Sequence, residues 1–162
     1  MFDHGDVAQL KARGDLAELM VAADLLRQGH KLALPYGEDW DYDLIVGRDC
    51  GALEKVQVKH VRSDGRVVVV KCLSRSLTAG RVRATKRYTA QTVDWIAVWD
   101  ATSERCYYVP ARELGAGRAT INLRLDPPAN GQRAGVRFAA NYLELGPARG
   151  RGANGNTRPL QG

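Results

Sequence analysis

Gln57 and Lys59 stand two residues apart within the apolar run 56–61, which is an unusual place for a polar pair. Side chains alternate between the two faces of a strand, so the amide and the ammonium are expected to project to the same side. Burial of a lysine costs several kcal/mol unless its charge is paired. The run therefore predicts that a neighbouring segment brings a carboxylate to this face.

A second apolar run, 42–46, precedes the first, and the residues between the two runs are rich in turn formers, which predicts a hairpin. A turn in the middle of that stretch places Asp43 opposite Gln57. The same register places Asp41 opposite Lys59. A carboxylate, an amide oxygen and an ammonium would then converge on one side of the hairpin.

A helix is expected over 7–28, because a glycine follows this segment and no proline interrupts it. Glu18 falls on a helical stripe that should pack against the sheet, and the other members of the stripe are Leu10, Gly14, Val21 and Leu25. In the alternative, Glu18 lies at the edge of the stripe beside Asp15 and reaches solvent.

In this order and spacing the residues resemble the PD-(D/E)XK nuclease superfamily. Within it, the chain is most similar to the small homing endonucleases associated with group I introns, in which glutamine replaces the usual acid before x-Lys. The motif's leading proline is absent, and Tyr42 precedes Asp43 instead. The segments that carry the resemblance are Lys11-x-x-Gly14-Asp15-x-x-Glu18, Tyr42-Asp43-Leu44-Ile45-Val46 and Val56-Gln57-Val58-Lys59.

The resemblance implies metal-dependent cleavage of phosphodiester bonds in double-stranded DNA, with Mg²⁺ as the cofactor and Mn²⁺ able to substitute. Lys59 would orient the attacking water or stabilise the developing negative charge. Asp41 is an alternative to Glu18 as the second acid. The implied catalytic residues are Glu18, Asp43, Gln57 and Lys59, and the implied metal ligands are Glu18, Asp43, the side-chain oxygen of Gln57 and the carbonyl of Val58.

Basic charge is concentrated in 62–87, and this observation is independent of the resemblance. The segment carries eight basic residues against the single acid Asp64, a local charge of +7 in a chain of net charge +6. Such a concentration indicates a phosphate-binding surface, and the alternative is a solvated face. The stretch 74–81 is expected to be a mobile loop, with Tyr88 either touching the DNA backbone or packing beneath the loop. The expected DNA-binding residues are Arg62, Arg66, Lys71, Arg75, Arg81, Arg83, Lys86, Arg87 and Tyr88.

The length of 162 residues suits one domain, 1–145, followed by a Gly/Arg-rich tail, 146–162, that is expected to be disordered. The three cysteines are expected to be free thiols. The patterns predict an α/β fold of the mixed α+β kind, a mixed sheet flanked by helices, and the resemblance implies a restriction-endonuclease-like core. Strands are expected near 31–34, 42–46, 54–61, 66–73, 94–99, 105–109 and 119–123, with a short helix near 85–91 and a helical turn at 110–114.

No run of about 18 apolar residues could span a membrane, and the N-terminus lacks a secretory signal, so a cytoplasmic, intracellular location is expected. We expect an endonuclease of the homing type acting as a homo-oligomer, a dimer or a tetramer, because two symmetric active sites cut both strands most simply. The alternatives are a Holliday junction resolvase and a non-catalytic DNA-binding module with the same fold.

Overall fold

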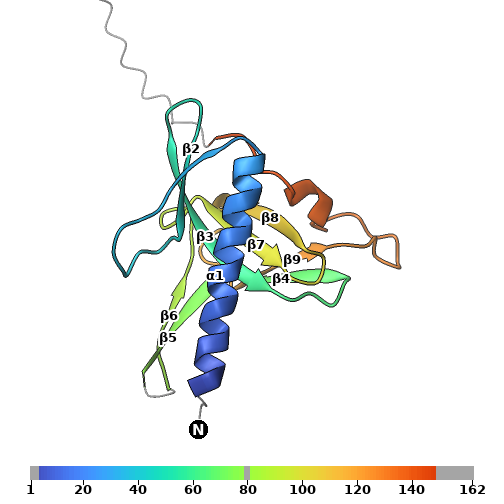
Figure 1. The fold of residues 1–162 in the computed structure, drawn as a ribbon. Helices are drawn as coiled ribbons and strands as arrows, with labels where there is room; N and C mark the ends of the chain where they lie inside the picture. The colour runs from blue at the N-terminus through green and yellow to red at the C-terminus, as the bar shows by residue number, and fades with distance from the viewer. Residues whose placement is uncertain (1–3, 79–80, 149–162) are drawn as a thin grey trace, which may run out of the picture.

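The computed structural model of the chain describes residues 4–78 and 81–148. The elements, in chain order, are α1 (His4–Arg27), β1 (Lys31–Ala33), β2 (Leu44–Gly47), β3 (Leu53–Val61), β4 (Val67–Lys71), β5 (Leu73–Thr78), β6 (Arg81–Arg87), β7 (Trp95–Asp100), β8 (Arg105–Pro110), the 3-10 helix η1 (Ala111–Leu114), β9 (Thr120–Arg124) and the 3-10 helix η2 (Ala139–Tyr142) (Figure 1).

Five strands form a central mixed sheet in the order β1-β2-β3-β7-β8. The central pair, β3 and β7, is parallel, and the other neighbours are antiparallel. Every residue of β7 is buried, as expected for a central strand that is covered on both faces. The strands expected in the first 61 residues and near 94–99 and 105–109 are confirmed, and so are the strand near 119–123 and the turn at 110–114.

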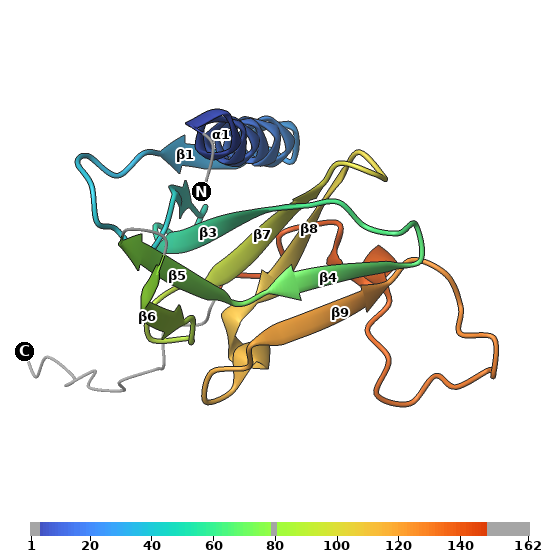
Figure 2. The same ribbon diagram turned by 90° about the horizontal axis from the view of Figure 1, so that it is seen from below.

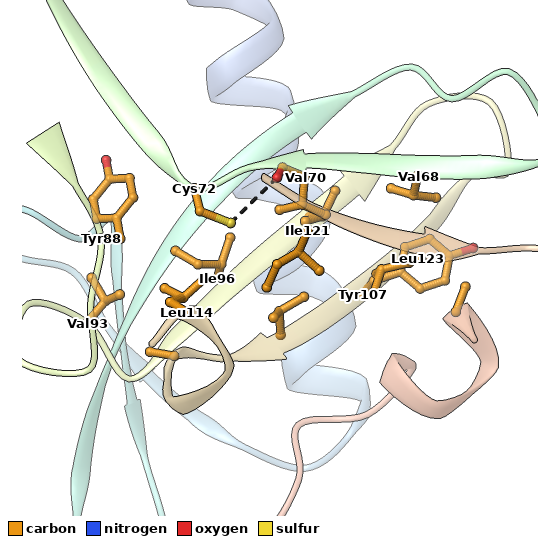
Figure 3. Packing of buried hydrophobic residues seen from close by; sticks show 14 residues of the cluster. Val68, Val70, Cys72, Tyr88, Val93, Ile96, Tyr107, Leu114, Ile121 and Leu123 are labelled. Atoms are coloured by element: carbon orange, nitrogen blue, oxygen red, sulfur yellow. Dashed lines mark hydrogen bonds between the residues drawn. The ribbon is translucent and has the colours of Figure 1, made fainter. Parts of the chain in front are cut away.

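The sheet is covered on its two faces by different elements (Figure 2). On one face α1 buries Ala17, Val21 and Leu25 against the sheet. On the other face the two-stranded ribbon β4–β9 packs on the sheet through an apolar cluster that includes Val70 and Ile121 (Figure 3). The expected mixed α+β class is therefore confirmed, although among the described residues an α-helix covers only one face.

Val56 and Val58 belong to the cluster under α1, so the intervening side chain of Gln57 and that of Lys59 point to the opposite face. On α1 itself, the predicted stripe is only partly correct. Leu10 is 60% exposed, because the first turns of the helix extend beyond the sheet (Figure 1).

The described residues of the segment 74–81 belong to strands and not to a loop, which corrects the prediction from sequence. β5 and β6 pair as an antiparallel hairpin with an irregularity between Ser76 and Leu77, and residues 79–80 lie outside the described residues. The helix expected near 85–91 is also wrong, because β6 continues to Arg87. Every side chain of β6 is exposed, so neither face of the hairpin carries the apolar alternation that marks a strand.

The expected strand 66–73 is divided at Cys72 into β4 and β5, which belong to different sheets.

All three cysteines are free, as expected. The predicted tail lies largely outside the described residues, which end at 148. Within the described part of the chain, no helix has the length and hydropathy needed to cross a membrane.

Asp100 closes the end of the central sheet. Its carboxylate is fully buried and accepts hydrogen bonds from the amide and the hydroxyl of Ser63, each at 2.8 Å, and from the hydroxyl of Ser103 at 2.7 Å. Burial opposes ionisation, but the hydrogen bonds from Ser103, Ser63 and Thr102 outweigh it and lower the pKa of Asp100. The carboxylate thereby holds the turn that follows β3, which carries Arg62 and Arg66.

Candidate active site

Asp43 immediately precedes β2 and lies where the predicted register placed it, since Leu44 pairs with Val56. Its Oδ2 accepts a hydrogen bond of 2.8 Å from the backbone amide of Val58 and one of 2.6 Å from Nε2 of Gln57. Burial raises the pKa of Asp43, while the Val58 amide and the charge of Lys59 oppose this rise. Asp43 is thus a largely enclosed carboxylate with two donors on one of its oxygens.

Gln57 is only 9% exposed, and its Nε2 also donates to the carbonyl of Val58 at 3.2 Å. The sequence led us to expect the amide oxygen at the carboxylate, but the nitrogen faces it. The reason is electrostatic, because two oxygen atoms at 2.6 Å would repel one another and an N–H donor is attracted. A half-turn of the terminal amide would bring Oε1 to the same place.

Lys59 is half-buried and is held by a carbonyl and an aromatic ring. Its Nζ lies 3.5 Å from the carbonyl oxygen of Leu73 and 5.0 Å from the centre of the Tyr88 ring. Burial lowers the pKa of Lys59, and the nearby Asp43 opposes this. Among residues 4–78 and 81–148, no carboxylate lies within ion-pair distance of Nζ.

Asp41 does not pair with Lys59, which corrects the extrapolated register. It forms an ion pair with Lys86 of β6 instead. The ladder between β2 and β3 ends at Leu44, so the chain before Asp43 is free to leave the plane of the sheet and meet the hairpin.

Glu18 projects from α1 at the edge of its buried stripe, which is the second of the two alternatives left open by the sequence. Partial burial raises its pKa, and the charges of Asp43 and Asp15 add to the rise. Glu18 and Asp43 line the same pocket of about 320 Å³, together with Trp40 and Tyr42. The helix and the sheet therefore bring two carboxylates to one hollow.

The oxygens around this hollow fit a hard divalent ion. Two carboxylates, from Glu18 and Asp43, line the hollow. Next to Asp43 lies the side-chain amide of Gln57, which donates to Asp43 and to the carbonyl of Val58, so that these two residues could add neutral oxygens. A cation would also relieve the repulsion by which Asp43 raises the pKa of Glu18. The described residues contain no group of three or more His, Cys, Asp or Glu side chains that could hold a metal ion, so neutral oxygens would have to complete the set.

The predicted basic residues all have exposed side chains, but two of them are held by contacts with the rest of the protein. Lys86 is paired with Asp41, and Nη1 of Arg87 donates to the carbonyl of Gly117 at 2.9 Å. These two anchor the hairpin to the body of the protein. The remaining predicted cations occupy the turn after β3, the end of β4 and the hairpin, and they are Arg62, Arg66, Lys71, Arg75, Arg81 and Arg83.

Tyr88 is 4% exposed and belongs to the core cluster (Figure 3). Of the two alternatives for this side chain, packing beneath the basic segment is therefore the correct one, and a contact with the DNA backbone is not supported.

A groove of about 580 Å³ begins beside Lys59 and runs between β3 and β4. Its lining includes the apolar side chains of Val61 and Val69 and the cations Arg62 and Lys71. Sequence reasoning missed this groove, because the run of four valines in β4 indicates burial on both faces, whereas Val69 is 43% exposed.

A mixed sheet whose central strand places Gln-x-Lys beside an aspartate has the architecture of the PD-(D/E)XK nucleases. A family model described as PD-(D/E)XK endonuclease matches residues 8–145, and the chain belongs to this family. A solved structure of a bacterial homing endonuclease, I-Ssp6803I, has the same fold, with a TM-score of 0.62 and 23% sequence identity over 82% of this chain and 86% of that chain. Comparison with curated proteins gives no match.

Replacing Gln57 by glutamate would set two carboxylates at the contact where Nε2 now donates to Asp43. At neutral pH in EDTA we expect Gln57→Glu to lower the free energy of unfolding by about 1–3 kcal/mol, because a buried hydrogen bond is lost and like charges repel. Burial already raises the pKa of Asp43, and a second carboxylate beside it adds to this rise. As the pH falls, one of the two carboxylates takes up a proton, and the loss in the free energy of unfolding becomes smaller. Thermal unfolding with EDTA or Mg²⁺ measures both effects, and Mg²⁺ should restore most of the loss.

The matched control is Gln91→Glu, since Gln91 is exposed and lies outside the site. It should unfold like the wild type in both buffers. If Mg²⁺ stabilises Gln57→Glu no more than it stabilises Gln91→Glu, these oxygens do not hold the ion.

Proposed function

We propose that the protein is a Mg²⁺-dependent endonuclease of the homing type that hydrolyses phosphodiester bonds in double-stranded DNA. The observation that carries the proposal is the contact of Asp43 with Gln57 and Val58, with Lys59 projecting beside it, in a chain of the PD-(D/E)XK endonuclease family. The solved structure of the same fold is described as that of a homing endonuclease, which supports the homing type.

Each residue of the site has a distinct part in this proposal. Asp43 and Glu18 would hold the metal ion, with the Val58 carbonyl and the Gln57 amide oxygen. The bound ion stabilises charge on the phosphate and lowers the pKa of a water molecule. Because Lys59 has no carboxylate within ion-pair distance among the described residues, its ammonium can donate to the phosphate oxygens as they gain charge.

Cleavage of supercoiled plasmid and of a synthetic four-way junction, with Mg²⁺ or EDTA, tests the proposal. We expect cutting only with Mg²⁺ and a loss of at least about 100-fold in Asp43→Ala and in Lys59→Ala, because each removes a charge that acts on the reacting phosphate. Asp126→Ala and Lys31→Ala are matched controls, since both side chains are exposed outside the site.

The substrate that is cut decides between related activities. Preference for the four-way junction would replace the homing assignment by a resolvase. DNA binding that persists without cutting of plasmid, junction or a randomised sequence library, and without any effect of metal, would establish a non-catalytic binding module.

We further propose that the β5–β6 hairpin is the main DNA-contacting element. A two-stranded ribbon is marginal in water by itself, and this one exposes all of β6 and carries no acidic residue. It has the width that the major groove of B-DNA admits. Arg75 pairs with Thr85 on one of its faces, while Lys86 on the other face turns toward Asp41. Phosphates or base edges would contact the part of the hairpin that lies farther from the body than Lys86 and Arg87, which anchor it.

Removal of two hairpin cations should weaken binding in a salt-dependent manner. For the double variant Arg75→Ala, Arg83→Ala we expect the slope of log K against log [salt] to fall by about 2, because each phosphate contact contributes about 0.9. Titration of a labelled duplex with the protein, in buffers that contain Ca²⁺ and several concentrations of KCl, measures the slope. Arg105→Ala, an exposed cation outside 62–87, is the control, and equal slopes for all three proteins would remove the hairpin from the DNA interface.

We also propose that the active molecule contains at least two copies that pair through the outer face of α1. Leu16, Leu19 and Leu26 on this face are 47%, 69% and 58% exposed. With Ala12 and Ala23 they repeat at intervals of four and three residues, the spacing of a helix that packs on another helix. Two active sites related by symmetry would cut both strands of a duplex.

A charge in the middle of this face should separate the copies. We expect Leu19→Glu to reduce the molar mass measured by light scattering during gel filtration to that of one chain, because the carboxylate would be buried unpaired. Leu53→Glu, at a leucine that is 73% exposed outside α1, should leave the mass unchanged. A single-chain mass for the wild type would overturn the pairing.

A further inference from the structure

We infer that Tyr88 is the positioning residue of Lys59, and that the face of its ring directs the ammonium toward the phosphate. This assignment differs from the DNA contact expected from the sequence, and it rests on the proposed role of Lys59 in cleavage. Tyr88 itself touches neither the metal ligands nor the reacting atoms in this proposal, and it acts only through the lysine.

The contacts of Lys59 single out the ring. Its Nζ is 5.0 Å from the centre of the Tyr88 ring, within the range of a cation–π interaction. The other partner, the carbonyl of Leu73, lies at 3.5 Å, which is the outer limit of a hydrogen bond. No ion pair to Lys59 is present in the described residues. The aromatic face is therefore a direct contact of the ammonium, and it acts beside the longer-range attraction of Asp43.

A lysine side chain is long and flexible, and it loses rotamer entropy when it is held in one place. A carboxylate could hold it, but the carboxylate would then compete with the phosphate for the same N–H donors. A ring face attracts the charge through its quadrupole without accepting a conventional hydrogen bond. Tyr88 can therefore fix the direction of Lys59 and leave its donors free for the substrate.

Tyr88 is itself firmly placed. Its backbone amide donates to the carbonyl of Cys72 at 3.1 Å, and its ring belongs to the buried cluster with Val93 (Figure 3). Burial raises the pKa of its hydroxyl, and a hydrogen bond with the side chain of Ser74 opposes the rise. The ring thus joins Lys59 to the root of the β5–β6 hairpin.

Single-turnover cleavage, with enzyme in excess over the substrate that the wild type cuts best, tests the inference. Tyr88→Phe keeps the ring and should retain the rate within about threefold. Tyr88→Leu removes the ring, and a trifluorinated phenylalanine at position 88 keeps its shape but weakens its quadrupole. Both should cut about tenfold more slowly, while DNA affinity in Ca²⁺ stays within about twofold of the wild type.

The same fluorinated residue at Tyr107, another tyrosine of the cluster, is the matched control, and it should leave the rate unchanged. Tyr88→Leu also removes buried contacts and could fold poorly. The decisive comparison is therefore between Tyr88→Phe and the variant with trifluorinated phenylalanine at position 88. Equal rates for these two, or a loss that appears in affinity instead of rate, would overturn the role of Tyr88. Full activity of Lys59→Ala would instead show that the proposed role of the lysine is wrong.

Discussion

The difference in length between two neighbouring strands determines the site. β2 begins at Leu44, whereas β3 continues to Val61, so the amide of Val58 points into a place where no strand lies beside it. A buried backbone amide requires an acceptor, and the carboxylate of Asp43 supplies it at 2.8 Å. Satisfying this backbone group fixes the acid, and the amide of Gln57 and the pocket shared with Glu18 are arranged around it.

The same strand serves two layers of the protein. Val56 and Val58 pack under α1, while the side chains of Gln57 and Lys59 point to the face that carries the β4–β9 ribbon and Tyr88. Glu18 reaches the hollow from the helix side. The proposed site therefore lies at the margin of the sheet, where polar groups from both layers can meet without crossing the apolar interior.

Much of this arrangement could be predicted from the sequence, because turn formers alone separate two apolar runs and fix the partner of Asp43 as Gln57. The ion pair of Asp41 with Lys86 could not, since it joins residues that are 45 positions apart through a hairpin with no apolar face. The sequence could not decide between the two alternatives for Tyr88 for a related reason. Tyr88 follows two cations in the sequence, but the chain turns inward at the end of β6, and no periodicity marks that turn.

The hairpin is fastened at its root, by Lys86, Arg87 and Tyr88, and the rest of β6 touches little of the body. Substitutions at exposed positions usually change stability by less than about 0.5 kcal/mol. The part of the protein proposed to meet DNA can therefore vary in sequence almost without cost to folding, while the Asp43 contact and the core beneath it stay the same. Such a division would allow related proteins to acquire new DNA targets while they keep the same catalytic site.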